Sequence, residues 1–127
     1  MNRRLTSSKS ERLKKRNDIE TLFQKGKAFS VFPLKAMVLI NAQQEHGIKA
    51  GFVVPKKNTA LATRRNRIKR LMRETWRLHK SQLANGSAGV HLFFIFNGKK
   101  EDQNYSTILD SMQKLIAKIN TSFSAAP

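Results

Sequence analysis

The side chains of this sequence that could do chemistry gather in one segment, residues 64–80. On an ideal helix, with successive residues about 100° apart, six of its polar side chains share one narrow face: Asn66, Lys69, Arg70, Arg73, Arg77 and Lys80. Arg64, Arg65 and Arg67 add cations at its start. The planar guanidinium of arginine can bind two phosphate oxygens at once. Because so dense a row of like charge repels itself unless anions neutralise it, the segment predicts a phosphate-binding surface.

The opposite side of the same segment is mostly apolar. Its residues recur at helical spacing: Ile68, Leu71, Met72, Thr75, Trp76 and His79. We therefore expect one long helix that ends near His79 or Lys80 and packs its apolar side against a sheet. Glu74 is the only acid within the helix, and we expect it to pair with Arg70 or Arg77.

The charge of the whole chain points to an anionic partner. Its 127 residues suffice for one domain, and 25 Lys and Arg against 8 Asp and Glu give a net charge of +17. Residues 1–80 hold 21 basic and 5 acidic residues, a net of +16, whereas residues 81–127 hold 4 and 3, a net of +1. Nucleic acid or an acidic membrane surface would neutralise such an excess.

Several kinds of site are disfavoured by what the sequence lacks. Without cysteine, the chain has no disulfide, no thiol nucleophile and no cysteine-ligated metal. His46, His79 and His91 are scattered, with no plausible serine or paired carboxylates, so we predict packing roles for His79 and His91 and neither a metal site nor a catalytic side chain. The longest apolar run, Val90–Phe96, has the length of a strand, so we predict no membrane partner and a cytoplasmic location.

The remaining pattern predicts an α/β (α+β) fold, a two-layer sandwich in the order α-β-β-α-β-α around a small mixed central sheet. Residues 33–41 and 48–54 are the first two expected strands, and we expect them to form an antiparallel hairpin. Residues 90–96 are apolar on both faces and predict a central strand covered on two sides.

Two further helices and an N-terminal arm complete the prediction. The first helix is capped by Asn17 or Asp18 and stops at Gly26. Residues 1–14 are polar and basic, which predicts a flexible arm. The last helix carries an apolar stripe at Tyr105, Ile108, Leu109, Met112, Leu115, Ile116 and Ile119.

Residues 65–74 read RNRIKRLMRE, and residues 50–57, a short way upstream, read AGFVVPKK. At this interval the two segments resemble the Arg-Asn-Arg signature helix, and the segment before it, of the protein subunit of bacterial ribonuclease P. Residues 13–26 are similar to the first helix of the family. Together these segments cover most of residues 13–80, and the resemblance implies that residues 15–127 are a single ribonuclease P protein-like domain.

The resemblance implies a non-catalytic subunit of a ribonucleoprotein endoribonuclease. In that family a catalytic RNA, using bound Mg²⁺, removes the 5′ leader from precursor tRNA, and the protein contributes no catalytic residue and no cofactor of its own. The signature helix and the loop before it contact the catalytic RNA, which implies these residues: Lys56, Lys57, Arg64, Arg65, Asn66, Arg67, Lys69, Arg70, Arg73 and Arg77. A cleft between the first helix and one sheet face binds the leader, which implies Ile19, Phe23, Lys35 and Met37.

Alternatives remain at the level of the residues. Ile19 and Phe23 could instead be core residues, and Met37 stands where related proteins often have an aromatic side chain. Gly51 permits a close backbone approach or a bulge. A ribosomal or other structured-RNA-binding protein without a role in cleavage is the main rival function. A DNA partner is not predicted, because a strand and a lysine-rich loop, rather than a helix and a short turn, precede the basic helix.

Overall fold

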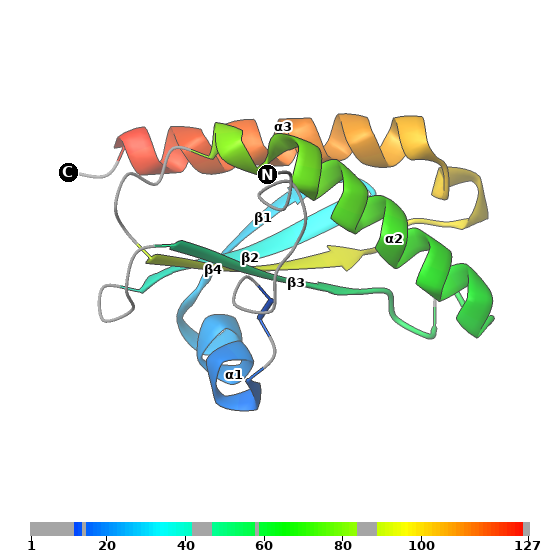
Figure 1. The fold of residues 1–127 in the computed structure, drawn as a ribbon, viewed down its shortest axis with the longest axis horizontal. Helices are drawn as coiled ribbons and strands as arrows, with labels where there is room; N and C mark the ends of the chain where they lie inside the picture. The colour runs from blue at the N-terminus through cyan, green and yellow to red at the C-terminus, as the bar shows by residue number, and fades with distance from the viewer. Residues whose placement is uncertain (1–11, 14, 42–46, 58, 84–88, 126–127) are drawn as a thin grey trace, which may run out of the picture.

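The computed structural model describes residues 12–13, 15–41, 47–57, 59–83 and 89–125 (Figure 1). Its elements run in the order helix, three strands, helix, strand, helix, which confirms the predicted mixed α+β class. They are α1 (Arg16–Lys25), β1 (Lys27–Val31), β2 (Leu34–Asn41), β3 (Gly47–Val53), α2 (Ala62–His79), η3 (Lys80–Gln82), β4 (Gly89–Phe96), η4 (Lys100–Asp102) and α3 (Tyr105–Ala125).

The strands form one mixed sheet in the order β1-β2-β4-β3. β4 pairs antiparallel with β2 and parallel with β3. The predicted hairpin between residues 33–41 and 48–54 is therefore wrong, because β4 lies between these two strands. β3 instead reaches β4 through α2, the kind of crossover that parallel neighbours require. The central place of β4 is confirmed, because it pairs with a strand on each side. Its apolar side chains on both faces suit such a position.

One edge strand, β1, was not predicted. Its five residues pair antiparallel with β2, from Lys27 opposite Val38 to Val31 opposite Leu34. Side chains of α3 satisfy carbonyls of this strand: Ser111 Oγ donates to Val31 O, and Lys118 Nζ donates to Ser30 O at 3.0 Å. A short, mixed-polarity strand gives little local signal, so contacts from a distant helix rather than its own pattern stabilise it.

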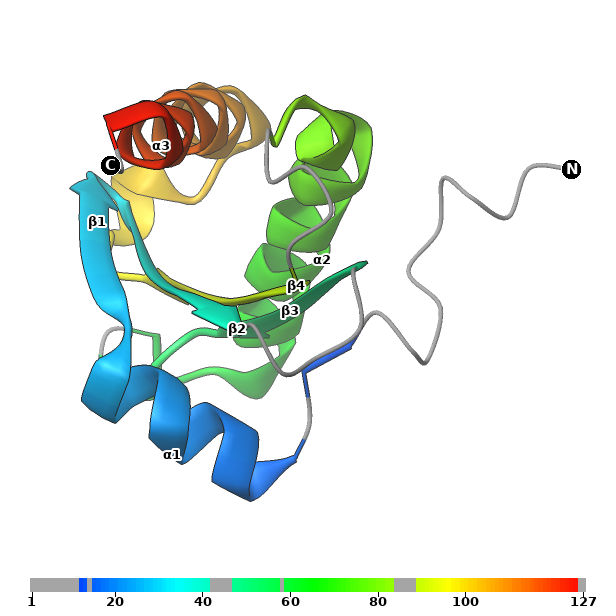
Figure 2. The same ribbon diagram turned by 90° about the vertical axis from the view of Figure 1, so that its left-hand side faces the viewer.

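The main core lies between the sheet and the helices α2 and α3, which cover the same sheet face (Figures 1 and 2). Leu92, Phe94 and Phe96 of β4 are completely buried there. Trp76 of α2 packs on Phe94 with ring centroids 5.3 Å apart, which confirms its expected place in the core. α1 lies on the opposite face and covers it only in part, because a helix of 10 residues is about 15 Å long.

The beginning of α1 differs from the prediction. Its N-cap is Lys15, without a side-chain cap hydrogen bond, so the predicted cap at Asn17 or Asp18 is wrong. Asp18 lies in the first turn instead, where a carboxylate is favoured by the helix dipole. Gly26 follows the last helical residue, as predicted.

The end of the predicted arm is packed against the sheet. Leu13 is buried, its N–H donates to Ala50 O at 3.0 Å, and Arg12 forms a bridge beside β3. The folded part of the chain therefore begins by Arg12 rather than at residue 15. Residues 1–11 and 14 lie outside the described residues, and for them the flexible arm remains a prediction.

Candidate nucleic-acid interface

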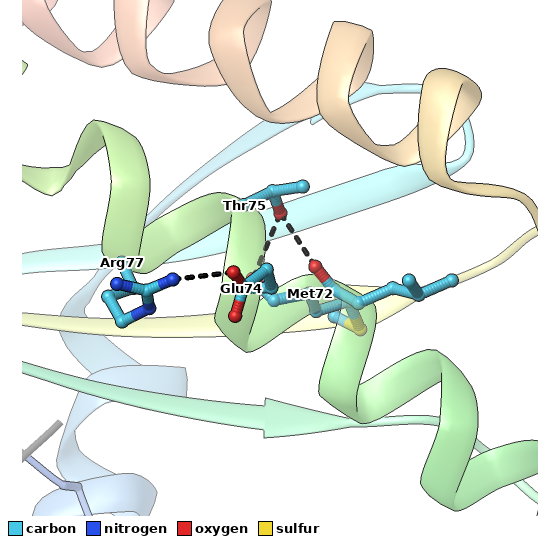
Figure 3. A network of polar contacts seen from close by, with 5 residues as sticks. Met72, Glu74, Thr75 and Arg77 are labelled. Atoms are coloured by element: carbon cyan, nitrogen blue, oxygen red, sulfur yellow. Dashed lines mark hydrogen bonds and ion pairs between the residues drawn. The ribbon is translucent and has the colours of Figure 1, made fainter. Parts of the chain in front are cut away.

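Helix α2 is one unbroken helix with a buried side and an exposed side. Ile68, Met72 and Trp76 are buried against the sheet and α3. Thr75 is also buried, and its hydroxyl donates to the carbonyls of Leu71 and Met72 one turn earlier, so it needs no other partner (Figure 3). The other side carries the predicted phosphate-binding residues, which differ in how far they are exposed. The exposed ones are Arg64, Asn66, Arg67, Arg70 and Arg73. The half-buried ones are Arg65, Lys69 and Arg77.

Most cations of this exposed side have no acidic neighbour. Glu74 pairs with Arg77, one of the two partners expected for it (Figure 3). Within the described part of the chain, Arg64, Lys69, Arg70 and Arg73 have neither a hydrogen bond nor an ion pair. Their mutual repulsion is therefore not relieved by the described carboxylates, and an external anion would relieve it. We call these residues, with Asn66 and Arg67, the α2 basic face.

Arg65 differs from its neighbours because its guanidinium is already engaged. Its Nη1 donates to Thr59 O at 2.9 Å and to Ala60 O at 2.6 Å. The side chain therefore fixes the loop before α2, at whose other end the exposed Lys56 and Lys57 lie. The guanidinium keeps further N–H groups that can donate to an anion. Arg65 therefore has two roles, of which shaping this loop comes first.

The connection between β4 and α3 adds two lysines that the sequence reasoning missed. Gln103 Nε2 donates to Thr59 Oγ1 at 3.3 Å, and Arg67 Nη1 approaches Gln103 O at 3.5 Å, so this connection lies beside the start of α2. Lys99 and Lys100 are exposed there. The signal in the sequence is the lysine doublet itself, which lies within residues 81–127, a segment of near-neutral net charge.

The sheet face beneath α1 brings together the other four predicted residues. Lys35 and Met37 lie on the same face of β2 and are half-buried. On α1, Leu22 is completely buried, Ile19 is half-buried and the side chain of Phe23 remains 48% exposed. Phe23 is therefore not a core residue, and Ile19, Lys35 and Met37 on this side of the sheet are only partly covered.

Two residues of β4 belong to the same face and were not among the predicted cleft residues. Phe93 lies opposite Met37, Ile95 lies opposite Lys35, and both are half-buried. Phe93 also contacts Phe23 edge to face, with ring centroids 5.5 Å apart and planes at 72°. The sequence indicated that β4 is covered on both sides, but not that α1 is too short to cover the whole second side.

Comparison with known proteins identifies the family. A sequence profile of the family described as Ribonuclease P matches residues 8–120. The chain belongs to the ribonuclease P protein family. A ribonuclease P protein component from Porphyromonas gingivalis is 44% identical over 77 residues, 60% of this chain and 56% of that protein, so the match spans little more than half of that relative. Another, from Syntrophus aciditrophicus, is 30% identical over 116 residues, 91% of this chain and 92% of that protein.

Solved structures of RNase P proteins have the same fold. The protein from Staphylococcus aureus superimposes with a TM-score of 0.72 at 27% identity, covering 87% of this chain and 98% of that one. The protein from Thermotoga maritima gives a TM-score of 0.69 at 26% identity, covering 86% of this chain and 97% of that one. The four-stranded mixed sheet and the helices around it are thus those of RNase P proteins.

In this ribonuclease P family chain, the packing role expected for His91 is confirmed. His91 is buried on the sheet face beneath α1, and its Nε2 has no hydrogen-bond partner among the described residues. Burial lowers the pKa of His91 below its usual 6.5, an effect that Asp18 opposes and Lys49 reinforces. The imidazole is therefore neutral near pH 7. His79 is half-buried with its Nδ1 3.2 Å from Gln82 Nε2, and His46 lies outside the described residues.

The described residues of this chain contain no group of three or more His, Cys, Asp or Glu side chains that could hold a metal ion. Glu20, Glu74 and Asp110 each pair with a basic residue on their own helix. The donor set of this part of the chain therefore does not fit an Mg²⁺ site, and we assign no step to a protein-bound metal. Among the same residues, no helix is long and apolar enough to cross a membrane.

Proposed function

We propose that this chain is the protein subunit of ribonuclease P and binds two RNA elements through two separate surfaces. The α2 basic face, with Lys56 and Lys57, binds the catalytic RNA. The sheet face beneath α1 binds the single-stranded 5′ leader of precursor tRNA. The observation that carries the proposal is the unbroken helix α2, whose apolar side is buried and whose exposed cations lack described acidic partners.

The contacts with the catalytic RNA are of two kinds. Arg64, Arg67, Arg70 and Arg73 are exposed and can each bind phosphate oxygens in pairs. Asn66 can both donate to and accept from base edges, and Lys69 and Arg77 contribute charge beside them. Arg65 acts through the loop whose carbonyls it holds. Most of these contacts read the RNA backbone and its shape, as expected for docking on a folded RNA.

The leader site combines apolar surface with positive charge. Phe23 and Met37 offer apolar surface, Ile19 lines the helix side, and Lys35 supplies a cation on the same sheet face. Unpaired nucleotides are held by stacking on such surfaces while cations bind the phosphates. Because α1 and α2 lie on opposite sides of the sheet (Figure 2), the leader and the catalytic RNA can be bound at the same time.

The chemical step belongs to the RNA in this proposal. The RNA and its bound Mg²⁺ cleave the leader, and the protein orients the substrate by holding both RNA elements in one complex. Its cations also lower the electrostatic repulsion between substrate and catalytic RNA, which reduces the need for free cations. A cytoplasmic location is part of the same proposal.

Reconstitution tests this function against the rival structured-RNA-binding protein. A bacterial ribonuclease P RNA and a precursor tRNA are incubated at low Mg²⁺ with and without the protein, and leader release is measured. At low Mg²⁺ we expect cleavage only with the protein. At high Mg²⁺ the protein should make no difference to whether the leader is released. Tight binding of the RNA without any stimulation of cleavage would favour the rival.

A further inference from the structure

Gly51 of β3 leaves space that the ring of Phe93 fills. The two residues are register partners on the parallel strands β3 and β4. A Cβ atom built on Gly51 would lie 2.6 Å from both Cδ1 and Cε1 of Phe93 and 3.2 Å from Leu13 O. Any side chain at position 51 would therefore push the ring away from β3. The absence of one lets the ring lie over the strand, which is the close approach that the sequence suggested for this glycine.

In that position the Phe93 ring supports Phe23. The rings meet edge to face at 5.5 Å and 72°, the geometry that the charge distribution of aromatic rings favours. Phe23 nevertheless keeps 48% of its surface exposed, whereas its neighbour Leu22 is completely buried. Leu22 thus anchors α1 to the sheet, and Phe23 is not needed for that purpose.

Cations lie on both sides of this aromatic pair. On the sheet face beneath α1, Lys35 lies opposite Ile95, two residues beyond Phe93 along β4. Lys49 lies opposite His91, two residues before Phe93. An exposed aromatic ring between two cations is the arrangement that holds one unpaired base with its flanking phosphates.

We propose that Phe93 is a positioning residue that holds the exposed ring of Phe23 as the base-stacking surface of the leader site, and that Gly51 provides the space for it. This inference rests on the proposed function and names the residues that carry its leader contact. It also explains how the site works with Met37 on β2: the aromatic surface is supplied by α1 and supported from β4. Phe23 touches the base, and Phe93 acts through Phe23.

The test uses the complete protein reconstituted with a bacterial ribonuclease P RNA. Affinity is measured for a precursor tRNA and for the mature tRNA without leader, and their ratio reports the leader contact. A second substrate carries 2-aminopurine in the leader, whose fluorescence is quenched when the base stacks. The variants are Phe93→Leu, Phe93→Tyr and Gly51→Ala, with Phe52→Leu as the matched control. Phe52 stacks on Phe94 at the same 5.5 Å centroid distance, but on the core face of the sheet.

We expect Phe93→Leu and Gly51→Ala to lower the affinity ratio roughly 2- to 10-fold, the range of one aromatic pair, and to reduce the quenching. Phe93→Tyr keeps the ring edge and should therefore keep both the affinity ratio and the quenching at their wild-type values. Phe52→Leu lowers the melting temperature without changing the ratio. Loss of melting temperature in Phe93→Leu with ratio and quenching unchanged would overturn the inference, because Phe93 would then only stabilise the fold.

Folding and function are separated by two further readouts. If Phe93→Leu or Gly51→Ala does not fold, Phe23→Leu changes an exposed ring and must still abolish the quenching, while Phe93→Tyr must keep it. Quenching that survives in Phe23→Leu, or quenching that is lost in Phe93→Tyr, contradicts the inference. If wild-type protein stimulates cleavage but never quenches the probe at any leader position, the inference fails and the proposed function stands. If it neither stimulates cleavage nor binds the RNA, the proposed function itself fails.

Discussion

Helices α2 and α3 lie side by side on the same sheet face, yet their outer sides differ (Figure 1). α3 is close to neutral outside: Lys114 pairs with Asp110 at 3.0 Å, and Lys118 donates to the carbonyl of Ser30. α2 carries seven Lys and Arg in its 18 residues against one acid, Glu74. Since both helices bury an apolar side in the same core, the fold requires nothing more of either. The excess charge on α2 is therefore explained by a partner rather than by folding.

The largest effects are expected where the two helices are alike, on their buried sides. Trp76→Ala on α2 should cost about 3–5 kcal/mol of unfolding free energy, and Leu115→Ala on α3 about 2–5 kcal/mol, because each leaves a cavity in the core. Denaturant unfolding measures both. Unfolding free energies within about 0.5 kcal/mol of wild type would show that one of these helices is not held by its apolar side.

The next effect should separate the helices. The double change Arg70→Ala and Arg73→Ala should weaken binding to ribonuclease P RNA by about 1.5 kcal/mol for each arginine, the lower end for hydrogen bonds to charged groups. Stability should change little, because both side chains are exposed. Filter binding or fluorescence anisotropy gives the affinities, and an isolated leader oligonucleotide serves as the second ligand.

The matched control is Lys114→Ala, which removes an exposed cation from α3, the helix beside α2 on the same sheet face. It should leave RNA affinity within about 0.5 kcal/mol of wild type, since surface ion pairs contribute little. If Lys114→Ala weakened RNA binding as much as one α2 arginine, the difference between the two helices would have no functional meaning. Equal losses for leader and catalytic RNA in the double variant would likewise argue against two separate surfaces.

The smallest effect concerns the other side of the sheet, under α1. Because burial lowers the folded-state pKa of His91 below the 6.5 of the unfolded chain, the unfolded chain binds more protons between these two values. The stability that depends on neutral His91 is thus complete above about pH 6.5 and falls as the pH drops through that value toward the folded-state pKa.

Unfolding free energies of wild type and His91→Leu across pH 5–8, at roughly 0.5 pH intervals, measure this contribution. The unfolding free energy of wild type minus that of His91→Leu should decrease below about pH 6.5, the pKa of the unfolded side chain. RNA affinity per folded molecule should change much less. A difference that stays constant across the range would mean that His91 does not titrate differently on folding.

The comparison of α2 with α3 also indicates what sequence can predict. The buried and exposed sides of α2 follow from helical periodicity, a local property, so Met72, Trp76 and Arg70 were placed correctly. Strand pairing is not local. Nothing in β2 or β3 alone indicates that β4 enters between them, and β1 depends on contacts with Ser111 and Lys118 far along the chain.

The candidate site divides in the same way. The cations of α2 are read from spacing, but the engagement of Arg65 with Thr59 and Ala60 depends on the path of the loop. Phe93 was missed because its exposure is decided by how much of the sheet α1 covers. Sequence therefore predicts residues that act through their own helix, and the structure is needed for those that act across elements.

The most direct test of the central claim is the salt dependence of binding between this protein and a bacterial ribonuclease P RNA. If the α2 basic face and its neighbours meet about six phosphates, the logarithm of the association constant should fall with the logarithm of the salt concentration at a slope of roughly −4 to −5. The Arg70→Ala, Arg73→Ala double variant should flatten that slope by about 1.5. A wild-type slope of roughly −1 would contradict the account, because one phosphate contact cannot explain the charge that α2 carries.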